Sequence, residues 1–195
     1  VGVENVAVGG LALSPNTSGS SNVAVGYASL FTNTTGTDNV SIGAYGLFRN
    51  VIGINNVAIG RSSLFNNTAS NNTAVGFEAA YSNTSGVAIT AIGYQALKAN
   101  TGDYNTALGY QSLRDNTTGI DNASVGFASL ISNTTGSANT AMGIGSLFYN
   151  TSGGNNVAIG RSSLFNNTAS NNTAVGFEAA YSNTSGTGVV ALGYQ

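Results

Sequence analysis

The sequence predicts an all-β protein, a parallel β-solenoid (β-roll) of about twelve coils with 16 or 17 residues each. A pentapeptide, Asn-(Val/Thr)-Ala-(Val/Ile)-Gly, recurs along the chain, and its glycines are always 16 or 17 residues apart. A unit of this length is too short for a domain or for paired helices, but it matches one coil of a solenoid. We therefore expect residues 1–195 to form a single repeat array, a segment of a longer solenoid or of a filament-forming chain. The glycines are Gly9, Gly26, Gly43, Gly60, Gly76, Gly93, Gly109, Gly126, Gly143, Gly160, Gly176 and Gly193.

The first half of each coil, the pentapeptide, alternates large, small and large side chains, as in Val57-Ala58-Ile59. This period of two predicts a β-strand that ends at the glycine in a tight turn. We expect the two large residues to face the interior of the coil. The middle residue is Ala, or Ser at Ser41 and Ser124, and we expect it to face a close contact with a neighbouring chain. The alternative is that small residues are simply tolerated on a solvent-facing wall.

The second half of the coil, as in Gly26 to Phe31, has apolar residues one, four and five positions after the glycine. This spacing fits both a bent strand and a short helical turn, and both remain open. A strand or irregular turn is favoured, because four or five residues do not nucleate a stable helix alone. Leu occupies the fourth position in most coils, as at Leu30, and we expect it in the core. Aromatic residues form a column at the first position, which Arg61 and Arg161 interrupt, so this column is expected at a surface or interface edge.

The last part of each coil begins with an Asn seven residues after the glycine, followed by Thr, Ser and Gly. All changes in coil length fall here, which predicts an exposed turn. If coils stack at about 4.8 Å, each Asn lies over the next and their amides can form hydrogen-bonded ladders. Thirteen Asn-x-Ser/Thr sequons, including Asn16, Asn33 and Asn83, fit either a glycan-coated fibre or ordinary turn chemistry, which we favour.

The composition excludes several classes of protein. Gly, Asn, Ser and Thr make up half of the chain, charged residues are 6%, the net charge is −2, and there is no Cys, His or Trp. Disulfides, Cys/His metal sites and His-based catalysis are therefore excluded, and five basic residues do not build a nucleic-acid surface. No apolar run is long enough to span a membrane. The acids are scattered singly, so we expect no enzyme and no catalytic, cofactor or metal site: Glu4, Asp38, Glu78, Asp103, Asp115, Asp121 and Glu178.

A duplication supports the modular interpretation, because Asn55 to Gly86 recurs letter for letter as Asn155 to Gly186. A rod tolerates the duplication of six units more readily than an enzyme core does. The core of one coil is thin, so side-by-side association would add apolar burial, and we expect a homo-oligomer, preferably a trimer. Both chain ends look like cuts through a longer array or like junctions of an end-to-end filament.

The pentapeptide Asn56-Val57-Ala58-Ile59-Gly60 resembles the repeat of trimeric autotransporter adhesin heads. The longer unit from Asn105 to Leu113 is similar to repeats in bacterial and phage tail-fibre-like proteins. The resemblance implies a left-handed parallel β-roll, three chains in one head, a location on the cell or virion surface, and a host-surface or glycan receptor. The coil here is a few residues longer than in the adhesin heads.

We expect a structural or adhesive extracellular fibre protein: a rigid shaft or head of an adhesin, tail fibre or surface filament. Two alternatives remain. A near-constant Thr column could order water as in an ice-binding solenoid: Thr17, Thr34, Thr68, Thr84, Thr101 and Thr117. Exposed aromatic residues could bind glycans: Tyr27, Phe77, Tyr94, Tyr110, Phe127, Phe177 and Tyr194.

Overall fold

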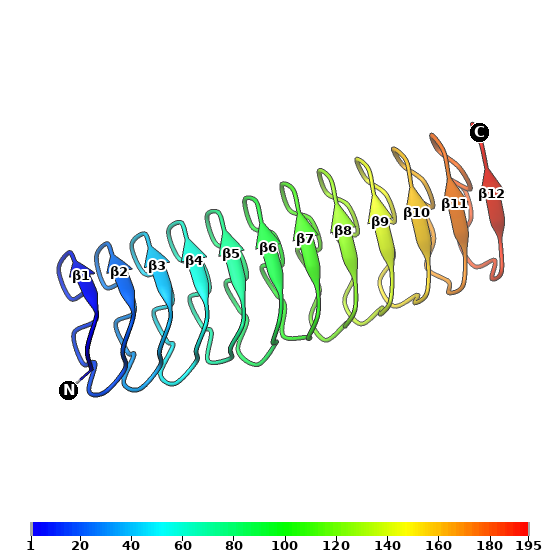
Figure 1. The fold of residues 1–195 in the computed structure, drawn as a ribbon. Coiled ribbons are helices and arrows are strands. Elements are labelled where there is room, and N and C mark those ends of the chain that lie inside the picture. Colours follow the sequence, from blue (N-terminus) through cyan, green and yellow to red (C-terminus); the bar gives the residue numbers. More distant parts are fainter. Residues whose placement is uncertain (1, 195) are drawn as a thin grey trace.

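The chain folds into one β-solenoid in a computed structural model that describes residues 2–194 (Figure 1). Its twelve strands form one sheet in chain order, and each strand pairs in parallel with the strands before and after it along the chain. The solenoid extends through residues 2–194, and Val1 and Gln195 of the predicted array lie outside the described residues. The strands are β1 (Val6–Val8), β2 (Val23–Val25), β3 (Val40–Ile42), β4 (Val57–Ile59), β5 (Thr73–Val75), β6 (Thr90–Ile92), β7 (Thr106–Leu108), β8 (Ala123–Val125), β9 (Thr140–Met142), β10 (Val157–Ile159), β11 (Thr173–Val175) and β12 (Val190–Leu192).

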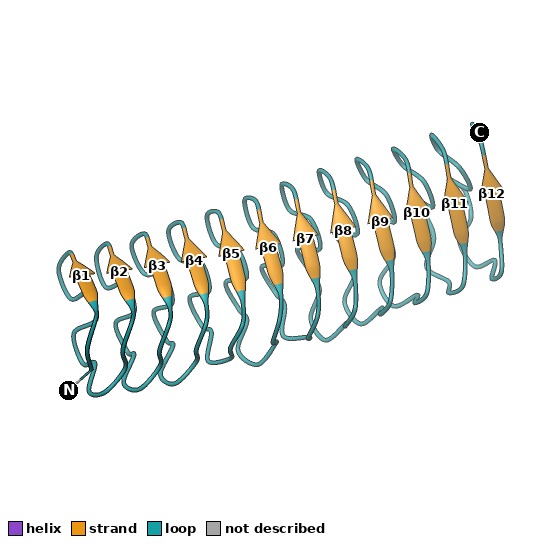
Figure 2. Ribbon diagram, viewed as in Figure 1, coloured by secondary structure: helices purple, strands orange, loops and turns teal. Residues whose placement is uncertain are grey.

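Only loops and turns connect the strands (Figure 2). The described residues contain no helix, so a short helical turn in each coil is wrong, and the bent, irregular alternative is correct. Among these residues there is accordingly no helix with the length and hydropathy needed to cross a membrane. The reason lies in the hydrogen bonds: the amide of Ala28 donates to Gly10 in the preceding coil, and the amide of Leu30 donates to Gly46 in the next. Bonding between coils thus replaces bonding within a helix.

The register confirms that like residues stack over like residues. Ala58 of β4 pairs with Ala74 of β5, although the intervening coil has 16 residues instead of 17. The shorter coil has one residue fewer in its turn. There the carbonyl oxygen of Ala69 accepts hydrogen bonds from the side chains of Asn56 and Asn67. In longer coils a glycine carbonyl accepts the equivalent hydrogen bonds. A change in turn length therefore leaves the columns in register.

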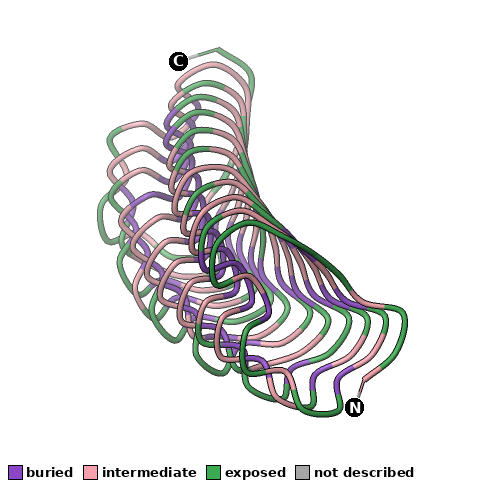
Figure 3. Ribbon diagram, turned by 90° about the vertical axis from the view of Figure 1, so that its left-hand side faces the viewer, coloured by how far each residue is buried: buried purple, intermediate pink, exposed green. Residues whose placement is uncertain are grey.

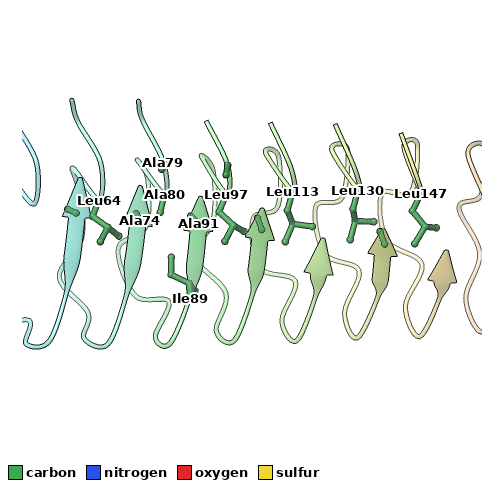
Figure 4. Close-up of a cluster of buried hydrophobic side chains, with 14 of the residues drawn as sticks. Leu64, Ala74, Ala79, Ala80, Ile89, Ala91, Leu97, Leu113, Leu130 and Leu147 are labelled. Atoms are coloured by element: carbon green, nitrogen blue, oxygen red, sulfur yellow. The ribbon is translucent and has the colours of Figure 1, made fainter. Parts of the chain in front are cut away.

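The strands bury their small residues and expose their large ones, which corrects the orientation predicted above. The middle residues Ala58 and Ser41 are fully buried, whereas Ile59 is 37% exposed and Val57 is half-buried. The cause is the opposite wall, where a fully buried Leu column already fills the narrow interior (Figure 4). Buried segments recur from coil to coil along the rod (Figure 3). At ordinary packing density the facing strand has room only for a methyl or hydroxymethyl group. The small column thus faces the protein's own core and does not contact a neighbouring chain.

The Leu column lies in a left-handed backbone conformation, with φ of 50° at Leu64 and 51° at Leu97. Every coil places further non-glycine residues at φ values near +55°, yet none of the positive-φ residues is Val, Ile or Thr. A branched Cβ clashes with the backbone in this region, so Leu and Ala are accepted there while Ile and Val are not. This backbone constraint explains why an otherwise ordinary core column never contains a β-branched residue.

The repeated glycine at the end of each strand is required for two reasons. Gly76 has a φ of +137°, and a Cβ placed on it would lie 2.4 Å from the carbonyl oxygen of Gly93 in the next coil. Any side chain here would meet both backbone strain and a neighbouring main chain. The glycine therefore allows the close stacking of coils at this corner.

Two buried ladders of Asn side chains run along the rod, as the sequence predicts. In one ladder, the amide nitrogen of Asn33 donates to the Asn16 side chain at 2.9 Å, and Asn116 donates to Asn100 at 2.7 Å. In the other, each side-chain oxygen accepts the next coil's backbone amide, as Asn39 Oδ1 does from Asn56 N at 3.0 Å. Because the polar groups of one coil are satisfied by the next, an isolated coil would leave them without partners.

Candidate functional site

The acidic residues do not converge in the structure. Within residues 2–194, no group of three His, Cys, Asp or Glu side chains lies close enough to hold a metal ion. Glu4, Asp38 and Asp121 lie in turns at positive φ, and Asp103 accepts a hydrogen bond from the Val87 backbone amide at 2.9 Å. These four carboxylates thus have positions in turns, and no two of them form an acid/base pair.

The sequon asparagines in the repeated turn belong to the first Asn ladder. Asn33, Asn83 and Asn133 are fully buried, and each amide nitrogen donates to a glycine carbonyl of its own turn. A glycan attached to such a nitrogen would break these bonds and would have no room. The geometry therefore favours turn chemistry over glycosylation at these positions, whereas Asn71 and Asn171 are exposed.

The Thr column of the turn uses its hydroxyl groups to link coils. Thr17 Oγ1 donates to the carbonyl oxygen of Thr34 at 2.9 Å, and Thr101 Oγ1 donates to that of Thr117 at 2.7 Å. The hydroxyl protons of these residues are therefore engaged by the next coil. This weakens the argument that the column orders water for ice binding.

The aromatic column one position after the glycine lies at the surface, as expected. Tyr94 stacks on Tyr110 with ring centroids 5.1 Å apart, and Tyr110 stacks on Phe127 at the same distance. These rings are roughly half exposed. Where arginine interrupts the column, Arg161 lies 5.6 Å from the ring centroid of Phe177, so the cation continues the stack.

A second aromatic column, five positions after the glycine, was not recognised as a stack from the sequence. Phe48, Phe65 and Tyr81 stack at centroid distances of 5.0 Å. The next two positions of this column are Lys98 and Arg114 instead of aromatic residues. This departure from the repeat is the sequence signal that could have revealed a distinct site.

An open groove of about 360 Å³ lies where the second aromatic column breaks. Its rim carries two ion pairs, Lys98 Nζ with Glu78 Oε2 at 2.8 Å and Arg114 Nη2 with Asp115 Oδ2 at 2.6 Å. A ladder of side chains continues from Glu78, because Gln95 donates to its carboxylate at 2.9 Å. The groove is lined by Ser82, Gln95, Lys98, Ala99, Arg114 and Asp115.

The ion pairs of this groove stabilise the charged forms of Glu78 and Arg114. The hydrogen bond from Lys98 lowers the pKa of Glu78; partial burial opposes this, and the hydrogen bond from Gln95 adds to it. The hydrogen bonds to Asp115 likewise raise the pKa of Arg114. The carboxylate form of Glu78 is therefore favoured, which is the opposite of the raised pKa that a general acid needs. The chemistry that fits these groups is hydrogen bonding to a polar ligand.

The outer face of the sheet exposes apolar side chains along the length of the rod. Its exposed residues come from the first and third positions of the strands, among them Ile92 of β6 and Leu108 of β7. None of the twelve strands contains an ionisable residue. We call this surface the sheet face. It was missed because the large residues were assigned to the interior, yet Thr73 and Thr90 at the first position already signalled an outward column.

Comparison of the chain with protein-family models, with curated proteins and with solved structures finds no match.

Proposed function

We propose that this chain is a structural segment of an extracellular fibre, a rigid shaft or head of an adhesin, tail fibre or surface filament. It acts without catalysis, through length, stiffness and display of its turns. Its association with further copies of the chain is part of the proposal. So is its location at a cell or virion surface, where a distal or lateral site would contact a host-surface or glycan receptor.

The observation that carries the proposal is that each coil depends on its neighbours. The core Leu column, both Asn ladders, the Thr hydroxyls and the aromatic stacks all extend from one coil to the next. Such an architecture has no closed core of its own and extends by repetition, which suits a shaft. The motif resemblance to adhesin heads and tail fibres supports the same function independently.

Electron microscopy of the purified protein, combined with mass measurement in solution, tests the proposal. We expect thin rods whose length matches twelve coils, roughly 55 Å at the usual strand spacing. Rods in side-by-side or end-to-end assemblies would support a fibre. Compact particles, or a chain that binds and turns over a small substrate, would contradict it.

Glycan binding is a second candidate function, favoured by the groove at Lys98 and Arg114. Tyr81, the last ring of its stack, is followed in the next coil by Lys98, which lines the groove together with Gln95 and Asp115. An aromatic ring beside planar polar groups is a combination suited to sugars, because the ring packs on C–H groups while the polar groups bind hydroxyls.

A glycan array followed by titration calorimetry tests this candidate. We expect Lys98→Met to weaken binding about tenfold through the loss of a charge-assisted hydrogen bond. Arg49→Met, which changes an exposed cation outside the groove, is the matched control. Equal binding by both variants would remove the groove from consideration.

A further inference from the structure

We propose that the sheet face binds the sheet face of a second copy of this chain. The inference rests on the proposed fibre function and names the surface through which copies associate. It replaces the expectation that the small column makes this contact, since that column is buried in the core. The partner surface instead consists of two outward columns, the first and third residues of every strand.

The third column of the sheet face is apolar in every strand, whereas the first column combines Val with Thr at five positions. Ile42, Ile59, Ile92, Leu108 and Met142 are all between 37% and 45% exposed on one continuous face. A water-facing sheet ordinarily carries polar side chains on that side. A long contiguous apolar surface on a soluble protein indicates an interaction site.

The size of the face reaches what a specific interface needs. Twelve strands at a spacing of about 4.8 Å, three residues wide at about 3.3 Å each, give a strip of roughly 500 Å². Two such strips facing each other bury roughly 1,000 Å², which is the smallest area expected of a biological interface between proteins. A single isolated coil would fall far short of this area.

A second copy fits this face better than an unrelated protein does. The face has no charge that could orient a foreign partner, and its rows repeat at the spacing of the coils. Another copy presents rows of the same side chains at the same spacing, so the Val, Ile and Leu side chains of one copy can enter the gaps between those of the other. Paired sheets of stacked, identical strands form dry, interdigitated interfaces of this kind. A twofold arrangement needs only one such patch per copy.

Mass measurement in solution across a range of concentrations tests the contact. We expect the wild-type chain to have at least twice its 19.5 kDa mass at micromolar concentration. In the double variant Ile92→Lys, Leu108→Lys, buried ammonium groups without partners should weaken association at least about a hundredfold. The control is Ile52→Lys, Ile120→Lys, which makes the same change at exposed positions in turns and should associate like wild type.

Chemical cross-linking provides a second measurement that does not depend on the lysine variants folding. The chain has no Cys, so a single introduced Cys is unambiguous. Thr106→Cys on the sheet face should give cross-linked pairs with a short bismaleimide, whereas Thr118→Cys in a turn should not.

Three results would overturn the inference. A wild-type chain that stays single at every concentration would do so, as would an assembly that the sheet-face variants leave unchanged. The third result is a single rod that inhibits ice growth and loses this inhibition in the Ile92→Lys, Leu108→Lys double variant. That result would identify the sheet face as an ice-binding surface. Single rod-shaped particles would remove only the association of copies from the proposed function and leave the rigid shaft standing, whereas compact particles would contradict that function as a whole.

Discussion

Two stretches of identical sequence, Asn55–Gly86 and Asn155–Gly186, have different surroundings in the same molecule. Ala80 and Asn83 are fully buried in the first stretch, whereas Ala180 and Asn183 are only partly buried in the second. The first has coils stacked on both sides, while β12 is the only strand after the second. Burial in this protein is therefore provided by neighbouring coils and not by the sequence of a coil alone.

The hydrogen bonds of the two stretches differ in the same way. The side-chain amide of Asn72 donates to both Asn67 and the carbonyl of Gly86, but among the described residues the side-chain amide of Asn172 donates only to Asn167. From this difference we expect the free energy of unfolding to be approximately a sum of contributions from each coil and from each contact between coils. Substitutions made at equivalent positions of the two stretches can test this directly.

The largest expected effect is at the corner glycine. Gly76→Ala places a Cβ at 2.4 Å from the Gly93 carbonyl oxygen with φ at +137°, and we expect a loss of about 3 kcal/mol or more in unfolding free energy. Gly176→Ala meets the same clash with Gly193, but only one strand follows it, so it should release the last coil and cost less overall. Urea unfolding followed by circular dichroism measures both. Equal losses would show that the rod unfolds as one indivisible unit.

The Leu column should be sensitive to side-chain shape more than to volume. Leu64→Ile introduces a branched Cβ at a φ of 50°, and we expect it to destabilise the protein by about 2–3 kcal/mol. Leu64→Met, which is unbranched and similar in volume, should cost less than about 1.5 kcal/mol. Thermal unfolding of the two variants side by side checks this order. If Ile were the milder change, backbone conformation would not be what selects Leu.

The Asn ladder should distinguish the interior from the end of the array. Asn83→Ala removes the donor to Asn67 and the acceptor for Asn100, so we expect a loss of about 2 kcal/mol. Asn183→Ala removes the equivalent donor to Asn167, and no Asn side chain among residues 2–194 donates to Asn183, so about 1 kcal/mol is expected. Chemical denaturation with matched variants measures the difference. A larger cost at Asn183 than at Asn83 would contradict the dependence on neighbouring coils.

The smallest effect concerns pH and the Glu78–Lys98 ion pair. The folded-state pKa of Glu78 is lowered, so its stabilising contribution is present above the unfolded-state pKa and is lost as pH falls through the lower folded-state value. Because both side chains are partly exposed, the contribution should be below about 1 kcal/mol. The difference in stability between pH 7 and pH 3 should shrink in Glu78→Gln. This difference between pH 7 and pH 3 should shrink less in Glu178→Gln, because the position equivalent to Lys98 lies outside this sequence. A larger change in Glu178→Gln than in Glu78→Gln would argue against the ion pair as the cause.

Much of the fold could be predicted because repetition converts sequence columns into structural columns. The strands, the corner glycines, the Leu core and the Asn ladders each followed from a position that is nearly constant in every coil, as at Gly76, Leu64 and Asn83. The groove was missed because its residues, Lys98 and Arg114, are exceptions to a column. A search for positions that stay constant from coil to coil does not detect residues that depart from their column.

The orientation of the strand was the principal error. In Val57-Ala58-Ile59 the alternation fixes that Ala58 is on one face and the large residues are on the other, but it does not say which face is inside. That choice depends on the width of the interior, which the Leu column of the opposite wall occupies.

The sequence by itself therefore determined the period, the parallel stacking, the columns and the absence of His and Cys chemistry, because each is a property of composition or spacing along one chain. Only the tertiary structure decided which wall is buried, where the groove opens and which surface is left apolar. All three depend on how the side chains of the two facing walls of a coil fill the interior between them. The repeat pattern gives the residues of each wall, but it does not say which side chains meet across that interior.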